Sequence, residues 1–137
     1  MKTLRIDHVT VATPDAARAQ ATFARFFGLG QATSAVAGGA ALTIGDARIE
    51  FVTPAAGSAL AAAMAANGEG MAALCLEVAS LDEAAERLRK GGVRFTAETS
   101  PAGRVMLVDQ SEAHGVRLTL VEQRIRTVAR ASHSVEK

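Results

Sequence analysis

The stretch GMAALCLEVASLDEAAERLRKGGVRF, residues 70–95, decides the fold of this 137-residue chain. It opens with a run typical of a β-strand and continues with a capped helix pattern, which Gly91 and Gly92 end before the next strand pattern begins at Val93. The same order occurs earlier in IDHVTVATPDAARAQATFARFFGL, residues 6–29, where the helix pattern stops at Gly28. Two copies of one strand–helix pattern in a short chain indicate an internal repeat.

Three short strand patterns, separated by glycine-rich turns, follow each helix pattern. They occupy residues 32–36, 40–44 and 47–53 in the first copy and residues 93–97, 103–108 and 115–122 in the second. When the two copies are aligned, His8 matches Ala73 and Glu50 matches Thr119. A half-buried sheet in one copy can bury its open face against the other, so we expect the copies to pack together.

The composition is that of one globular domain rather than a disordered chain. Hydrophobic residues make up 49%, charged residues 21%, and the formal net charge is +1. No basic face or apolar run of about 18 residues is evident, which argues against nucleic-acid and membrane partners. No secretory signal is read at the N-terminus, and the single cysteine forbids an internal disulfide, so we expect a cytoplasmic protein.

Several of these segments resemble the vicinal oxygen chelate superfamily, which contains glyoxalase I, methylmalonyl-CoA epimerase and bleomycin-binding proteins. The match is carried by residues 6–29, by RIEFVTP at 48–54, by the epimerase-like stretch 70–95 and by HGVRLTLVE at 114–122. The resemblance implies an α+β fold in which two tandem βαβββ modules form a curved, cup-shaped mixed sheet.

We expect the modules at residues 1–54 and 71–122. A linker with a short helix is predicted at residues 55–70, and a tail at residues 123–137.

In the metal-dependent members of this superfamily, a His on the first strand and a Glu or Gln on the fourth strand of each module bind one divalent metal. Carried over, the first module offers His8 and Glu50, whereas the second offers Ala73 and Thr119. Alanine has no donor atom, and threonine is at best a weak neutral ligand. We therefore expect no firmly bound cofactor, and at most a weak divalent metal at His8 and Glu50.

His8 and Glu50 are also the predicted catalytic pair, because a carboxylate that orients an imidazole raises its basicity. Glu50 shares its strand face with Arg48, so a simple surface ion pair is the competing interpretation. Arg48 and Arg117 occupy equivalent positions in the last strand of each copy, so both side chains are predicted to face the cup. Two such arginines favour an anionic or carbonyl-bearing ligand. The remaining positions predicted to line the cup are Thr10, Ala73, Cys75, Glu77 and Thr119.

Cys75 is expected to act as a small buried apolar residue rather than as a nucleophile. Glu77 is open to two interpretations, as a cup residue or as a surface residue at the end of a strand.

Three functions are compatible with the sequence. The first is an isomerase-, epimerase- or lyase-like enzyme that moves a proton next to a carbonyl group, with metal optional. The second is a metal-free protein that binds and sequesters a drug or metabolite, which the small residues Ala73 and Thr119 favour by enlarging the cavity. The third is a structural subunit that acts through dimerisation. The expected partners are a small molecule and a second copy of the chain.

Overall fold

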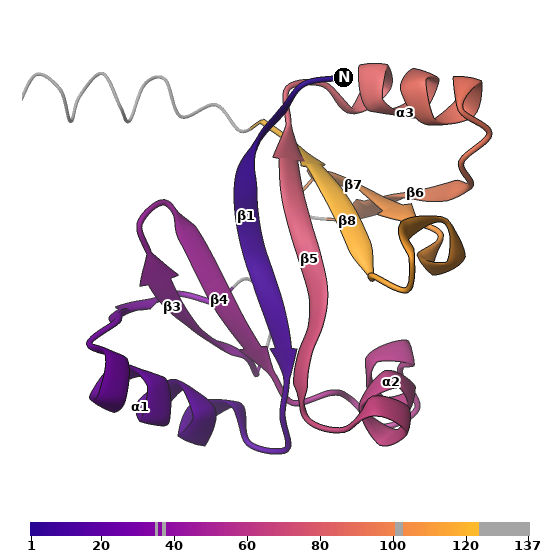
Figure 1. The fold of residues 1–137 in the computed structure, drawn as a ribbon. Helices are drawn as coiled ribbons and strands as arrows, with labels where there is room; N and C mark the ends of the chain where they lie inside the picture. Colours follow the sequence, from indigo (N-terminus) through magenta and orange to yellow (C-terminus); the bar gives the residue numbers. More distant parts are fainter. Residues whose placement is uncertain (35, 37, 101–102, 124–137) are drawn as a thin grey trace, which may run out of the picture.

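A computed structural model describes residues 1–34, 36, 38–100 and 103–123 (Figure 1). The first half contains β1 (Thr3–Ala12), α1 (Ala16–Phe27), β2 (Gly30–Ala32), β3 (Ala40–Ile44) and β4 (Ala47–Val52). After α2 (Ala59–Asn67), the second half contains β5 (Gly70–Val78), α3 (Leu81–Lys90), β6 (Phe95–Ser100), β7 (Gly103–Val108), the 3₁₀ turn η1 (Gln110–Ala113) and β8 (Leu118–Glu122). The predicted α+β class and the order of elements are confirmed. Apart from Gln123, the predicted tail lies outside the described residues.

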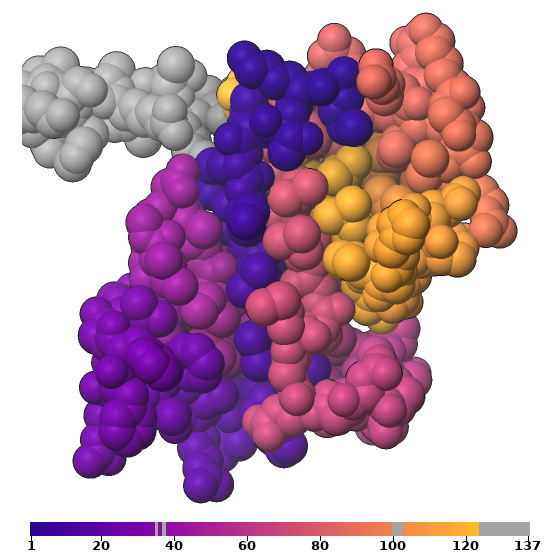
Figure 2. Space-filling model, viewed as in Figure 1, coloured from indigo at the N-terminus to yellow at the C-terminus, as the bar shows by residue number. Residues whose placement is uncertain are grey.

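All eight strands form one curled, open sheet in the order β2-β3-β4-β1-β5-β8-β7-β6. Its two halves mirror each other: β1 pairs parallel with β4, β5 pairs parallel with β8, and β1 meets β5 antiparallel in the middle. Figure 1 shows these two strands side by side at the centre. In the space-filling view, the first and second halves of the chain lie largely on opposite sides of them (Figure 2).

The register of β1 and β5 agrees with the internal alignment. His8 lies opposite Cys75 and Thr10 lies opposite Ala73, with Val9 and Leu74 paired between them. The alignment matches His8 with Ala73, and therefore Thr10 with Cys75. Exchanging the two copies thus converts the His8–Cys75 pair into the Ala73–Thr10 pair. Such a reciprocal register is what two copies related by a local two-fold axis require.

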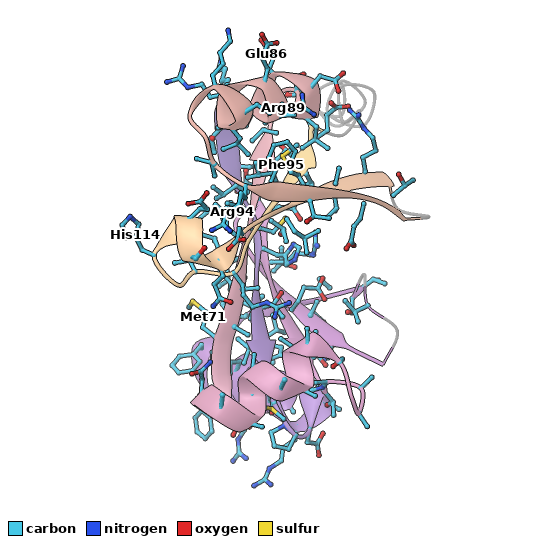
Figure 3. The ribbon with its side chains drawn as sticks, turned by 90° about the vertical axis from the view of Figure 1, so that its right-hand side faces the viewer. Met71, Glu86, Arg89, Arg94, Phe95 and His114 are labelled. Atoms are coloured by element: carbon cyan, nitrogen blue, oxygen red, sulfur yellow. The ribbon has the colours of Figure 1, made fainter. Side chains whose placement is uncertain are left out.

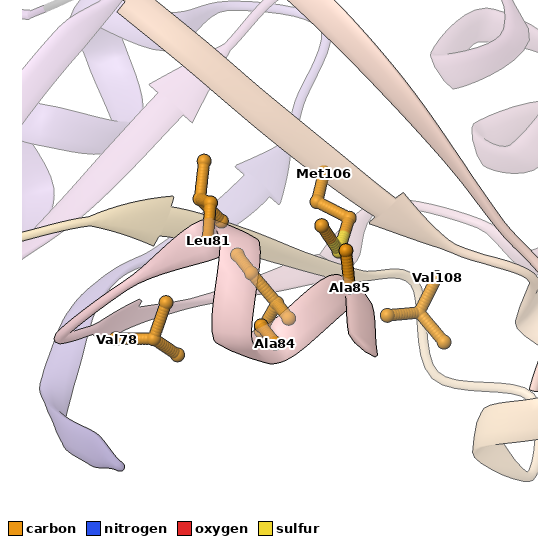
Figure 4. Packing of buried hydrophobic residues seen from close by; sticks show 7 residues of the cluster. Val78, Leu81, Ala84, Ala85, Met106 and Val108 are labelled. Atoms are coloured by element: carbon orange, nitrogen blue, oxygen red, sulfur yellow. The ribbon is translucent and has the colours of Figure 1, made fainter. Parts of the chain in front are cut away.

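Each half packs its helix on the same side of the sheet. Around α1 the buried residues are Ala16, Leu42 and Phe51, and around α3 they are Val78, Leu81, Ala84, Ala85, Met106, Val108 and Leu120 (Figure 4). Since strand side chains alternate, the neighbours of these core residues point to the other face, which we call the inner face. That face carries the polar residues of the cup.

The helices begin where side chains cap them. Ser80 accepts a hydrogen bond from the backbone N–H of Glu83 at 3.2 Å, as the capping-box spacing predicts. In the first half the N-cap is Asp15, whose carboxylate accepts from the N–H of Arg18 at 3.0 Å. Among the described helices, none is long and apolar enough to cross a lipid bilayer.

Two strands begin two residues away from their predicted starts. The strand expected at 32–36 is Gly30–Ala32, and the one expected at 93–97 is Phe95–Ser100. The last strand starts only at Leu118, because His114 and Gly115 both take positive φ angles and turn the chain before it. Local patterns locate strand ends poorly, since pairing with a neighbour decides where a strand begins.

Replacing Phe51 tests the contribution of the α1 cluster to stability. Its side chain is fully buried and its ring lies 5.2 Å from that of Phe23. We expect Phe51→Ala to lower the free energy of unfolding by about 3–5 kcal/mol, measured by urea denaturation. Phe26→Ala is the matched control, because Phe26 is 68% exposed and should change stability by less than about 1 kcal/mol. Equal effects at both positions would contradict this account of the core.

Candidate functional site

A β-bulge in β1 creates the site. Ile6 lies opposite Leu76, but the next paired residue is His8, opposite Cys75, so Asp7 is an extra residue on β1. The bulge brings two consecutive side chains to one place: Oδ2 of Asp7 lies 2.8 Å from Nδ1 of His8. Regular alternation would place them on opposite faces, so the contact between Asp7 and His8 could not be predicted from the sequence pattern.

The carboxylate of Asp7 contacts His8 and two arginines. It is 2% exposed, and Nη2 of Arg5 donates to its Oδ1 at 3.0 Å, while Nη2 of Arg48 lies 3.4 Å from its Oδ2. The hydrogen bond from His8 lowers the pKa of Asp7 most; burial opposes this, and the charges of Arg48, His8 and Arg5 add to it, so that the pKa falls to about 2. Asp7 is therefore ionised throughout the neutral pH range.

His8 is held between Asp7 and Cys75. Burial disfavours the charged imidazole, but hydrogen bonds to Asp7 and Cys75, together with their charges, outweigh it and raise the pKa of His8 to about 9. The side chain of His8 remains 24% exposed, whereas Cys75 is buried. At neutral pH the ring is mostly an imidazolium that still reaches the inner face. A contact between His8 and Cys75 depends on the pairing of β1 with β5, which the sequence does not reveal.

Arg48 lies between the two residues of the predicted catalytic pair. It is the register partner of His8 on β4, and its Nη2 lies 3.4 Å from Nδ1 of the ring. Its Nε donates to Oε2 of Glu50 at 3.0 Å. Oε1 of Glu50, a residue only 1% exposed, accepts a hydrogen bond from Ser34 at 2.6 Å. The structure therefore connects His8 with Glu50 through a guanidinium, and the nearest carboxylate partner of the ring is Asp7.

The second half places its predicted residues around cavities. Ala73 and Thr119 line a cavity of about 180 Å³, together with Leu107 and Arg117. Arg117 also borders a cavity of about 320 Å³ next to α2, and Gln110 lines both. Within the described part of the chain, the guanidinium of Arg117 has no ion pair. It is therefore available to an anionic or carbonyl oxygen.

Glu77 and Thr10, the two remaining predicted residues, lie on the central strands β5 and β1. Glu77 is 2% exposed, and its carboxylate lies 3.3 Å from Nε of Arg5. It is thus a buried ion-pair partner and not a surface residue. Thr10 is half-buried and lies opposite Glu50 on one side and Ala73 on the other. Arg5, which links Glu77 to Asp7, was not identified from the sequence, since it lies toward the edge of the strand pattern.

The residues at the four metal positions do not fit the metal centre that the resemblance implies. Ala73 has no donor atom and Thr119 is neutral, while both carboxylate oxygens of Glu50 already accept hydrogen bonds. A second group of donor atoms, from Asp7, His8 and Cys75, lies within 4.8 Å of one another. Two guanidinium groups already bind the carboxylate of Asp7, however, and their positive charge opposes a cation there.

The protonation of His8 can be measured directly. We expect its ring resonances in NMR spectra to titrate near pH 9 in the native protein, and Asp7→Asn to move the midpoint down toward 6.5. Because the folded-state pKa is raised, the stability that this proton contributes is complete below about pH 6.5 and is lost as the pH rises through about 9. His8→Gln identifies the resonance. An unshifted midpoint in the native protein would contradict the geometry described.

The sequence and the fold match a known protein family. The model of the Glyoxalase/Bleomycin resistance protein/Dioxygenase superfamily matches residues 7–108. Methylmalonyl-CoA epimerase from Mycobacterium tuberculosis is 27% identical, with a TM-score of 0.78 over 91% of each chain. A structure of methylmalonyl-CoA epimerase with methylmalonyl-CoA and NH4+ is 24% identical, with a TM-score of 0.80 over 90% of this chain and 97% of that one.

A variant of the Streptomyces coelicolor epimerase in complex with 2-nitronate-propionyl-CoA gives the same values, 24% identity and a TM-score of 0.80 over 90% of this chain and 97% of that one. The comparison with curated proteins found no match. The family model spans well over half of the 137 residues, and the eight-stranded curled sheet has the expected architecture. This chain therefore belongs to the Glyoxalase/Bleomycin resistance protein/Dioxygenase superfamily, the vicinal oxygen chelate proteins.

Proposed function

We propose that this protein moves a proton at the carbon next to a carbonyl group of a small molecule, as an isomerase, epimerase or lyase does. The observation that carries the proposal is the Asp7–His8 hydrogen bond of 2.8 Å, with the guanidinium of Arg48 lying 3.4 Å from the same ring. An oriented acid–base group beside a fixed positive charge is the arrangement that enolate-forming reactions need.

His8 carries the proton in this scheme. Because Asp7 occupies Nδ1, the proton from the substrate carbon goes to the other ring nitrogen, Nε2, as the C–H bond breaks, and the substrate displaces Cys75 from the ring. The electron pair of that bond moves toward the carbonyl oxygen, whose developing negative charge Arg48 stabilises. The imidazolium then returns the proton to the substrate. A pKa of about 9 makes His8 a strong base, although only about 1% of it is neutral at pH 7.

Glu50 acts as a positioning residue. Its hydrogen bond of 3.0 Å holds Nε of Arg48, and Ser34 fixes the other carboxylate oxygen at 2.6 Å. With both oxygens engaged, Glu50 keeps the guanidinium beside His8 without itself taking a proton. Glu50→Gln should therefore have a smaller effect on turnover than loss of His8.

The proposed substrate is a carbonyl compound with an anionic group. Arg117, which has no ion pair among the described residues, borders two cavities in the second half and can bind a carboxylate or phosphate oxygen. Two of the similar epimerase structures contain 2-nitronate-propionyl-CoA and methylmalonyl-CoA, respectively. Methylmalonyl-CoA, which has both a carboxylate and a thioester carbonyl, is therefore the first compound to test.

A binding protein without turnover is the second candidate function. The residues Ala73 and Thr119, which stand where metal-dependent relatives have ligands, border the cavity of about 180 Å³ and leave it open. A drug or metabolite that fills this space would be held by Arg117 and by the apolar wall of Leu107 and Leu118.

We also propose a cytoplasmic homodimer. Its support is the single cysteine, which suits a reducing compartment, and three large exposed side chains. Phe26, Phe27 and Met71 are 68%, 64% and 75% exposed, and contact with a second copy would remove such apolar side chains from water.

Exchange of the substrate α-proton with deuterated water separates the two functions. We expect the protein to exchange the α-proton of methylmalonyl-CoA, followed by mass spectrometry, and His8→Gln to slow exchange about 100-fold or more. Because the neutral ring is the base, the rate should rise about tenfold per pH unit until it levels off near pH 9.

The control is His114→Gln, since His114 projects from the outside of the loop after η1, away from the sheet (Figure 3). Binding of methylmalonyl-CoA without exchange would favour the sequestering function, and exchange that survives His8→Gln would contradict the assigned base.

The role of Arg117 is tested by affinity. We expect Arg117→Gln to weaken binding of methylmalonyl-CoA about tenfold or more in isothermal titration calorimetry, because it removes a charge-assisted hydrogen bond. Arg104→Gln is the control: Arg104 is about half exposed and pairs with Asp82 and Glu122 on the rim of the sheet. Equal losses for both variants would indicate nonspecific attraction of an anion.

A further inference from the structure

We propose that the guanidinium of Arg48 takes the place of a divalent metal ion in this protein, so that the cup has a permanent cation of its own. The site between His8 and Glu50 thereby holds a cation without a metal ion. This assignment stands whether the protein turns over its ligand or only binds it, because it rests on contacts within the chain.

The guanidinium is surrounded by the groups that would otherwise bind a metal. Its Nε lies 3.0 Å from Oε2 of Glu50, and its Nη2 lies 3.4 Å from both Oδ2 of Asp7 and Nδ1 of His8. Carboxylate oxygens and imidazole nitrogens bind zinc at about 2.0–2.2 Å, so the same atoms cannot face a guanidinium and a metal ion at once. Arg48 thus occupies one donor atom of each of these three residues, and its charge repels a second cation.

Burial explains why this arrangement is stable. Asp7 and Glu50 are 2% and 1% exposed, and a buried carboxylate needs a positive partner and hydrogen bonds to remain ionised. A metal ion or an arginine can serve as that partner, and the sequence supplies the arginine on the neighbouring strand. Arg48 is itself only 22% exposed, which keeps its charge effective across the site.

The internal repeat provides a built-in comparison. Arg117 of the second half corresponds to Arg48 in the alignment, but its neighbours there are Ala73 and Thr119 in place of His8 and Glu50. Arginine therefore occurs in both halves, whereas the anionic and imidazole groups surround it only in the first. Removing each arginine in turn separates the effect of the surrounding donors from the effect of losing one positive charge.

Cobalt binding tests the proposal, because Co2+ binds to the same types of ligand as zinc and its complexes can be followed by visible absorption. We expect the native protein to bind Co2+ only at millimolar concentration, and Arg48→Met to bind one equivalent at least about 100-fold more tightly, since it releases Oε2 of Glu50, Oδ2 of Asp7 and the ring of His8 from the guanidinium. Arg117→Met should behave like the native protein. Adding His8→Gln to Arg48→Met should abolish the gain, which assigns the new site to these residues.

Arg48→Gln serves as a second variant, because it removes the charge while keeping a hydrogen-bond donor for Glu50. A folded Arg48→Met or Arg48→Gln protein, checked by circular dichroism, that gains no affinity for Co2+ would overturn the proposal. Micromolar binding of Co2+ by the native protein would overturn it without any variant. Neither result depends on proton exchange, so failure here is distinct from failure of the proposed function.

Discussion

Mutual neutralisation of buried charges governs the inner face of the sheet. Arg5 and Arg48 lie among the carboxylates of Asp7, Glu50 and Glu77, each of which is no more than 2% exposed. Removing any one member would leave an uncompensated charge away from water, which typically costs several kcal/mol. The orientation of His8 depends on this network, because the carboxylate that binds its ring is also held by both arginines.

The apolar core and the polar residues of the site lie on opposite faces of one sheet. The apolar clusters around α1 and α3 lie on the outer face, and each belongs to a single half of the chain. The inner face contributes ion pairs and cavities and little apolar packing. Residues such as Ala73 and Thr119 can therefore differ from their counterparts His8 and Glu50 without disturbing either core. This separation allows one half of the cup to be charged while the other contains a cavity beside Arg117.

The parts of the structure that follow local rules could be predicted from the sequence. Ser80 caps α3 as its spacing to Glu83 indicates, and the repeat gave the order of the strands and the matching of His8 with Ala73. The partner of His8 could not be predicted, because the bulge at Asp7 breaks the alternation on which such reasoning depends. Cys75 lies beside the ring only through pairing of strands more than sixty residues apart, a relation that no local pattern encodes.

The way the two halves are joined has a mechanical consequence. Among the described strands, the sheet passes from one half to the other only between β1 and β5, and its pairing there is interrupted by irregular register at several points along β1. Bulges bend a strand and increase its local twist. The curvature of this one ribbon therefore sets the width of the cup, and with it the separation of His8 from Arg117, independently of the two helical layers.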